Sequence, residues 1–122
     1  MNTIRKGTHW EKSAESFLHR HGLKTVRRNY RCRLGEIDLV MRDGTGLVFV
    51  EVRYRGRDSH GSGADTVGHR KCARIARTAA LFLGRNPAYA AFHCRFDVIS
   101  IGKADGRTEF NWIRNAFQSP LG

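Results

Sequence analysis

Hydrophobic side chains recur at helical spacing in two stretches of the chain. The first stripe ends just before Gly22, and a glycine placed past the last turn commonly ends a helix. Its members are Trp10, Ala14, Phe17, Leu18 and His21. The second stripe, over about 67–83, consists of Cys72, Ile75, Ala76, Ala79 and Phe82. Each pattern predicts an amphipathic helix that packs on a core.

Four other stretches carry the pattern of strands. The clearest covers 47–53 and is rich in β-branched and aromatic residues. An Asp-Gly-Thr-Gly turn over 43–46 joins it to a strand over 36–42. A basic strand is predicted over 24–30, followed by a loop over 31–35, and a fourth strand is predicted over 95–101. Residues 54–66 are predicted to form a mobile basic loop.

The order of these elements predicts one α/β domain over residues 1–122. Helix, three strands, helix and strand indicate a mixed sheet with helices against it. The remaining C-terminal segment is expected to be a tail that covers the core. Its large hydrophobic residues are Trp112, Ile113 and Phe117.

The hairpin turn fixes how the two middle strands pair. When Arg42 lies opposite Leu47, Asp38 lies directly opposite Glu51. Side chains alternate along a strand, so two further charged residues share the face of these acids. Those residues are Glu36 and Arg53. The opposite face is expected to be apolar, with Ile37, Leu39, Met41, Val48, Val50 and Val52.

Two acids that face each other across a strand pair repel. Their Cβ atoms lie roughly 5 Å apart, and two ionised groups at that distance repel by about 3 kcal/mol at an effective dielectric near 20. A Mg²⁺ or Mn²⁺ ion held by Asp38 and Glu51 would offset this repulsion, because hard cations bind carboxylate oxygens. Alternatively, the acids form a metal-free ion-pair cluster with Glu36 and Arg53.

The charge of the chain bears on its partners. It has 22 Lys and Arg against 11 Asp and Glu, a formal net charge of +11 and a pI near 10.6. A folded domain this basic attracts polyanions. Nucleic acid is favoured over an anionic membrane, because no basic amphipathic helix with an aromatic face stands out. A divalent cation on an acidic pair within a cationic protein suits phosphodiester hydrolysis.

Glu11 is a candidate third ligand. It lies about 20° from Leu18 on a helical wheel, at the shoulder of the apolar face, where it could reach the sheet edge. Alternatively, it is a first-turn glutamate that the helix dipole stabilises. Glu36 is expected to hold a water molecule at the metal or to pair with Arg53.

The cellular compartment is predicted from the cysteines and from hydropathy. Cys32, Cys72 and Cys94 are odd in number and widely spaced, which indicates reduced thiols. The polar N-terminal segment has no apolar leader pattern, and no apolar run approaches membrane length. A cytoplasmic protein that does not bind membranes is therefore expected.

Several segments occur in an order and spacing that resemble one family. They are GTHWEKSAESFL from Gly7 with Gly22, RNYR from Arg28, GEIDLV from Gly35, FVEVR from Phe49, Lys71, RFDV from Arg95 and NAF from Asn115. Together they resemble the YraN family of bacterial endonuclease-like proteins. That family is similar to archaeal Holliday-junction resolvases and belongs to the PD-(D/E)XK nuclease superfamily.

The resemblance implies a restriction-endonuclease-like core, nucleic-acid binding and a Mg²⁺-type site. Glu11, Asp38 and Glu51 match the family's acids. Arg53 stands where the superfamily has lysine; arginine keeps the charge, but its pKa is too high for proton abstraction. Lys71 matches the family's second-helix lysine and could supply the missing ammonium; alternatively, it is a solvated lysine or a phosphate contact.

Basic residues could flank the predicted site and contact phosphates together; alternatively, each of them is a solvated surface cation. They are Arg27, Arg28, Arg31, Arg33, Arg55, Arg57, Arg70, Arg74 and Arg77. Such contacts position a protein on the nucleic-acid backbone without reading sequence. Trp10 is a further departure, because the family usually has glycine there, and it indicates local repacking.

The predicted function is that of a metal-dependent nuclease acting on DNA rather than RNA. A branched or damaged substrate follows from the family analogy alone. The alternatives are a nucleic-acid-binding module of the same fold that has lost turnover, and a basic protein-interaction module with a structural acidic cluster. A homodimer would suit symmetric cutting of two strands.

Overall fold

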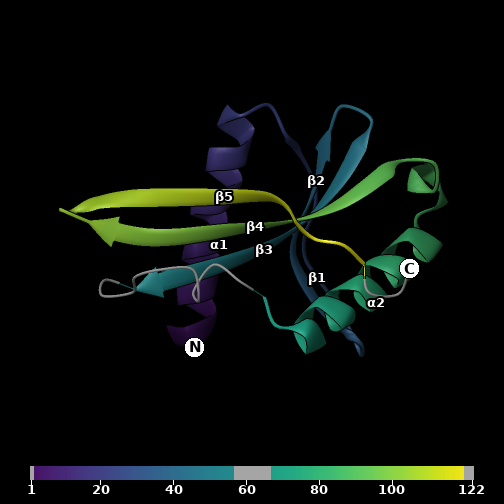
Figure 1. Ribbon diagram of the computed structural model, residues 1–122, viewed down its shortest axis with the longest axis horizontal. Helices are drawn as coiled ribbons and strands as arrows, with labels where there is room; N and C mark the ends of the chain where they lie inside the picture. The colour runs from purple at the N-terminus through teal and green to yellow at the C-terminus, as the bar shows by residue number, and fades with distance from the viewer. Residues whose placement is uncertain (1, 57–66, 120–122) are drawn as a thin grey trace.

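The computed structural model describes residues 2–56 and 67–119, with side chains from His9 onward (Figure 1). Its elements are α1 (Asn2–Arg20), β1 (Lys24–Cys32), β2 (Gly35–Asp43), β3 (Gly46–Gly56), α2 (His69–Arg85), the 3-10 helix η2 (Pro87–Tyr89), β4 (His93–Ala104) and β5 (Arg107–Phe117). No helix in these ranges is both long and apolar enough to cross a membrane.

The strands form one sheet in the order β1-β2-β3-β4-β5. Neighbouring strands are antiparallel except β3 and β4, which are parallel. A parallel pair needs a crossover connection, and α2 lies in that connection. The mixed α/β sheet with flanking helices agrees with the prediction.

Each face of the sheet buries an apolar cluster beneath one helix. The α1-side cluster contains Ala14, Leu18, Leu23, Leu39, Met41, Val48, Val50, Ile99 and Ile101. The α2-side cluster contains Tyr30, Ile37, Val40, Leu47, Phe49, Ile75, Ala76, Ala79, Phe82 and Phe96. The two helices therefore lie on opposite faces, with α1 behind the sheet in Figure 1. All five apolar positions predicted for α2 are buried.

The predicted hairpin register is confirmed as far as the pairing extends. The pairs run from Asp43 opposite Gly46 to Leu39 opposite Val50, where β2 and β3 stop pairing. The expectation that Ile37 shares the α1 side with Leu39 is wrong, because Ile37 belongs to the α2-side cluster. Beyond Leu39 the strand β2 is paired with β1 alone, so alternation along β3 no longer dictates its faces.

The predicted C-terminal tail is instead the edge strand β5. Asp105 and Gly106, at φ 51° and 74°, form a two-residue turn, since Ala104 pairs with Arg107. An Asp-Gly pair is a strong hairpin signal. Trp112 packs against the α1-side cluster and Phe117 against the α2-side cluster, so the tail residues do cover the core.

Two predicted loops are shorter than expected. β1 continues to Cys32, which pairs with Gly35, so only residues 33–34 form the turn. Residues 54–56 belong to β3, and the rest of the predicted loop over 54–66, including Arg57, lies outside the described residues.

A buried carboxylate joins β4 to β5. Asp97 is fully buried and accepts hydrogen bonds from Arg95 Nε at 3.0 and 3.2 Å. Its two oxygens also accept Trp112 Nε1–H and the backbone N–H of Asn115, both at 2.9 Å. These contacts bridge the register shift between Phe96 and Val98, where the β4–β5 ladder is interrupted.

Candidate functional site

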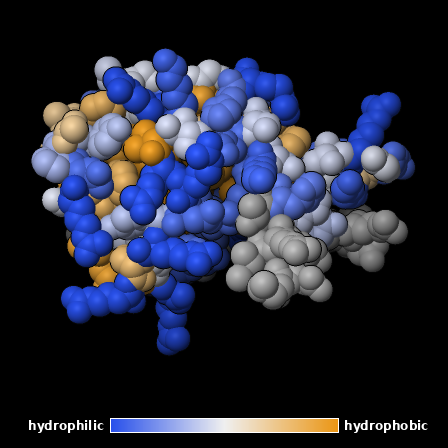
Figure 2. All heavy atoms as spheres, turned by 180° about the vertical axis from the view of Figure 1, so that it is seen from behind, coloured by the Kyte–Doolittle hydropathy of each residue, from blue (hydrophilic) through white to orange (hydrophobic). Residues whose placement is uncertain are grey.

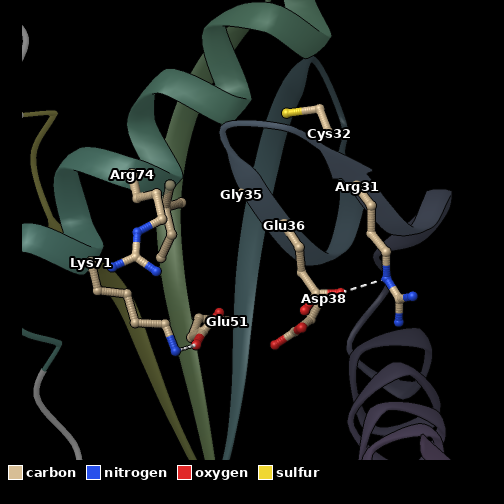
Figure 3. Close-up of a pocket in the computed structure, with 9 residues that line it drawn as sticks. Arg31, Cys32, Gly35, Glu36, Asp38, Glu51, Lys71 and Arg74 are labelled. Carbon is tan, nitrogen blue, oxygen red and sulfur yellow. Dashed lines mark hydrogen bonds and ion pairs between the residues drawn. The ribbon is translucent and has the colours of Figure 1, made fainter.

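The candidate site lies where β2 and β3 separate, facing α2. A cavity of about 480 Å³ opens there between the sheet and the helix (Figure 3). Its lining residues are Arg31, Cys32, Gly35, Glu36, Asp38, Glu51, Lys71, Arg74 and Ile75. Three carboxylates and three cations therefore share one concave space.

Gly35 determines how closely α2 approaches this space. A Cβ atom at Gly35 would lie 3.0 Å from Thr78 Oγ1 and 3.1 Å from Arg74 Cγ. Its φ of 154° is also rare for residues with a side chain. Thr78 is buried and donates to the Arg74 carbonyl, so this turn of α2 is fixed against the start of β2. The glycine thereby positions Arg74 over the acids.

Asp38 lies immediately past the last β2–β3 pair. Its Oδ2 accepts the backbone N–H of Val52 at 2.8 Å. Burial raises the pKa of Asp38 to about 8, helped by the negative charge of Glu51 and, to a smaller degree, of Glu11, while the Val52 hydrogen bond opposes the rise. Without a bound metal ion, this carboxyl group therefore favours its protonated form at neutral pH.

Glu51 is 7% exposed and forms an ion pair with Lys71 (Figure 3). Lys71 is in the first turn of α2, and half of its side chain is exposed. An ammonium on a flexible stem thus sits beside the second acid, contributed from another element. Lys71 therefore lies beside the acidic pair, and its role as the missing ammonium stays a prediction.

Glu11 reaches the site from α1. The helix begins at Asn2, so Glu11 lies in its middle, and the alternative of a first-turn glutamate is wrong. The Glu11 carboxyl group forms hydrogen bonds with Asn29 and Asp38, and burial raises its pKa. Asn29 was missed by the sequence analysis. It has φ 50° within β1, and an asparagine, which tolerates this conformation, in the middle of a strand was the available signal.

Glu36 pairs with a residue that the prediction did not name, and Arg53 is not part of the cavity lining. Glu36 pairs with Arg31, at 2.8 Å between Oε2 and Nε, on the rim of the cavity (Figure 3). Arg53 is half-buried in β3, in register with Ser100 of β4. Among the described residues, the cavity lining contains Lys71 and Arg74 from α2 but does not contain Arg53.

The donor set suits a hard divalent cation by its chemistry. Asp38, Glu51 and Glu11 offer only carboxylate oxygens, the ligands of Mg²⁺ and Mn²⁺. Within the described ranges, no three acid, histidine or cysteine side chains converge as a ready-made metal site. Two of these acids have other partners, since Glu51 pairs with Lys71 and Glu11 forms a hydrogen bond with Asn29. Mg²⁺ commonly uses one or two carboxylates and completes its shell with water and phosphate.

Only some of the predicted phosphate-binding arginines gather at the cavity. Arg31 and Arg74 line it, while Arg33 and Arg70 are exposed nearby in the chain. Arg28 instead forms an ion pair with Glu15, at 2.8 Å. The remaining described members are Arg27, Arg55 and Arg77.

The Arg28–Glu15 pair belongs to a network between α1 and β1. Burial alone would raise the pKa of Glu15, but hydrogen bonds from Arg28 and Thr25 lower it overall. The same partner raises the pKa of Arg28. The network is ionic and its hydrogen bonds are formed, so Arg28 is less available to a phosphate than the arginines at the cavity.

Hydrophilic residues dominate the surface seen from behind in Figure 2.

Comparison with known proteins places the chain in a family. Residues 10–101 match the family described as "Uncharacterised protein family UPF0102". A UPF0102 protein of Xanthomonas oryzae pv. oryzae (strain PXO99A) is 48% identical over 115 residues, which cover 93% of this chain and 92% of the relative. A UPF0102 protein of Ectopseudomonas mendocina (strain ymp) is 43% identical over 109 residues, covering 89% and 91% of the two chains.

One solved structure also shows a remote likeness. "The structure of Pyrococcus Furiosus SfsA in complex with Ca2+" matches at a TM-score of 0.40 and 13% identity. The match covers 95% of this chain and 65% of that one. The family match and the long, similar relatives show that this chain belongs to the UPF0102 family, which is YraN-like as the sequence motifs predicted.

Proposed function

We propose that this protein is a metal-dependent nuclease with a restriction-endonuclease-like core, which hydrolyses phosphodiester bonds in DNA. The observation that carries the proposal is the position of Asp38 in the cavity, where burial, together with the charge of Glu51 and to a smaller degree of Glu11, raises its pKa to about 8. Strongly perturbed acids inside a cavity are typical of functional sites. The chain's net charge of +11 supports a polyanionic substrate.

The residues around the cavity take separate roles in this proposal. Asp38 and Glu51 hold Mg²⁺ or Mn²⁺, and Glu11 supports Asp38 from α1. A bound divalent cation supplies Lewis-acid polarisation of the phosphoryl oxygen and a more acidic water. Lys71 orients the attacking water and balances negative charge beside Glu51, and so supplies the ammonium group that the superfamily has at the position of Arg53.

Arg31 and Arg74 bind the phosphates next to the scissile bond. Both line the cavity together with the acids, and guanidinium groups bind phosphate oxygens in a bidentate manner. They thereby orient the backbone without selecting a base sequence. Glu36, which pairs with Arg31, holds that guanidinium at the rim.

Cleavage of labelled duplex, single-stranded and four-way-junction DNA with Mg²⁺ or Mn²⁺ tests the proposal. Wild type is expected to cleave at least one substrate, and Glu51→Gln is expected to abolish cleavage. Glu109→Gln makes the same chemical change at an exposed residue of β5 and is expected to cleave like wild type. Equal activity of the two variants would place the chemistry elsewhere.

A second candidate function is a nucleic-acid-binding module of the same fold without turnover. It is favoured by the Lys71–Glu51 ion pair, which already neutralises the second acid, and by arginine in the lysine position. Arg53→Lys separates the two candidates. No cleavage by wild type or by Arg53→Lys, with DNA binding retained, would leave the binding module.

A further inference from the structure

Asn29 of β1 lies opposite Asp38 of β2. The β1–β2 ladder skips these two residues, although the pairs on both sides of them keep one register. Those flanking pairs are Arg28 with Leu39 and Tyr30 with Ile37. Asn29 has a φ of 50°, a left-handed conformation that asparagine adopts more readily than most residues with a side chain. The irregularity in β1 therefore falls at the level of the acid on which the proposed metal site depends.

Both strands change faces at this level. In a regular strand, every second residue points to the same face of the sheet. Arg28, however, forms an ion pair with Glu15 of α1, whereas Tyr30 packs in the α2-side cluster. Leu39 likewise belongs to the α1-side cluster and Ile37 to the α2-side cluster. The left-handed residue turns the chain of β1, and β2 turns with it because the two strands pair on both sides of the change.

The change of faces makes Asp38 reachable from both sides of the sheet. Its carboxyl group lines the cavity next to α2 (Figure 3) and also forms a hydrogen bond with Glu11 of α1. Regular alternation would have turned Asp38 to the α2 side alone, because its neighbour Leu39 packs on the α1 side. Asp38 thus takes a partner from each face because it lies where the faces change.

The Asn29 side chain makes a second connection to the acids. Its carboxamide N–H donates to the Glu11 carboxyl group, and this hydrogen bond opposes the rise that burial causes in the pKa of Glu11. Both residues line a small cavity of about 40 Å³ between α1 and β1. The Glu11 carboxyl group therefore lies between an amide donor and Asp38, with hydrogen bonds to both.

We propose that Asn29 is the positioning residue of the metal site, acting through its carboxamide on Glu11 and through its left-handed backbone on Asp38. The inference rests on the proposed function, because it assumes that these acids hold a divalent cation. Asn29 itself contacts neither metal nor substrate in this role. Residues that orient metal ligands from behind commonly contribute about 10- to 100-fold to metal affinity.

Calorimetric titration with Mn²⁺ tests the two parts of this role separately. Asn29→Gly removes the carboxamide but fits the left-handed backbone, and it is expected to weaken Mn²⁺ binding by about 10- to 100-fold. Asn29→Ala also disfavours that backbone and is expected to lose more affinity. Asn29→Gly binding as tightly as wild type would overturn the role of the carboxamide, and Asn29→Ala binding as tightly would overturn that of the backbone.

Asn115 provides a matched control in the same sheet. It also lies within a strand, β5, with a φ of 51°, and its backbone N–H donates to Asp97. Asn115→Gly makes the same chemical change and keeps that N–H, so it is expected to bind Mn²⁺ like wild type. Both glycine variants are expected to unfold cooperatively in thermal melts, because glycine fits both backbones. Equal losses of Mn²⁺ affinity at the two positions would contradict a role specific to Asn29.

The proposed function and the role of Asn29 fail in different ways. If wild type and both Asn29 variants bind Mn²⁺ equally while Asp38→Ala does not bind it, the metal site stands and the role of Asn29 is overturned. A wild type that takes up no Mn²⁺ would contradict both.

Discussion

Two aspartates of the same sheet, Asp97 fully buried and Asp38 half-buried, have opposite surroundings. Asp97 on β4 accepts hydrogen bonds from three N–H groups: the Arg95 Nε–H, which its two oxygens share, and the N–H groups of Trp112 and Asn115. Asp38 on β2 accepts a hydrogen bond from the Val52 backbone, shares one with the Glu11 carboxyl group and lies near the charge of Glu51. The first carboxylate is matched by donors, and the second is crowded by groups of its own charge.

We infer from this difference that Asp97 is a structural acid, and that Asp38 is the candidate for a functional one. A buried charge surrounded by donors stabilises the arrangement that surrounds it, and removing it leaves those donors unmatched. A buried acid beside other acids lowers the stability of the fold unless a proton or cation joins it. If burial were the only criterion, Asp97 would be the stronger candidate for a functional residue. The groups that surround each carboxyl group favour Asp38 instead.

The same substitution at both positions should give opposite effects on stability, with the larger one at Asp97. Asp97→Asn is expected to lower the free energy of unfolding by about 3–5 kcal/mol, because the charge that the Arg95 guanidinium pairs with is lost. Urea denaturation at pH 7 measures this loss. A change of less than about 1 kcal/mol would mean that the network adds little to the stability of the fold.

Asp38→Asn is expected to stabilise the metal-free protein at pH 8. Asparagine stays neutral and its Oδ1 can still accept the Val52 N–H, so a gain of about 0.5–2 kcal/mol is expected. Asp43→Asn, an exposed acid of the same strand, serves as the control and should stay within about 0.5 kcal/mol of wild type. Destabilisation by Asp38→Asn would contradict the crowding of the site.

The pH dependence of stability sharpens the same point. The pKa of Asp38 in the folded protein, about 8, lies above its ordinary value of 3.8, so the folded state binds that proton more tightly than the unfolded chain does. The stability that the protonated Asp38 side chain gives to the fold is fully present below pH 4 and is lost as the pH rises towards 8. Thermal melts in EDTA should therefore show the gain of Asp38→Asn growing from pH 5 to pH 8. A constant difference would refute the raised pKa.

The smallest expected effects concern single phosphate contacts. If about six cations engage duplex DNA, the log–log dependence of binding on salt has a slope near −5. Arg74→Ala should reduce the magnitude of this slope by about one, whereas Arg28→Ala should leave it unchanged because Glu15 holds that guanidinium. Anisotropy titrations at several salt concentrations measure both slopes. Equal changes would mean that the cavity does not face the DNA.

Local patterns predicted much of the fold. The Asp43–Gly46 turn fixed the register of the hairpin, and the spacing from Cys72 to Phe82 identified the buried face of α2. β5 was missed although its Asp105-Gly106 turn is a recognised hairpin signal. The face of Ile37 could not be predicted, because it depends on where β2 leaves β3, and that point is set by tertiary packing.

The site was predicted in part, and the limit lies in long-range partners. Alternation placed Asp38 and Glu51 together, and a family resemblance selected Lys71. The hydrogen bond between Glu11 and Asn29 links two elements whose packing no local pattern specifies. The same holds for Asp97, whose donors come from β4 and from the missed strand β5.

Calorimetric titration with Mn²⁺ at pH 8 tests the central claim most directly. Wild type is expected to bind one ion at the crowded acids, Asp38→Ala to lose that binding, and Asp43→Asn to keep it. If wild type takes up no Mn²⁺, or if Asp38→Ala binds it as wild type does, then the acids do not form a metal site, and the nuclease proposal is contradicted.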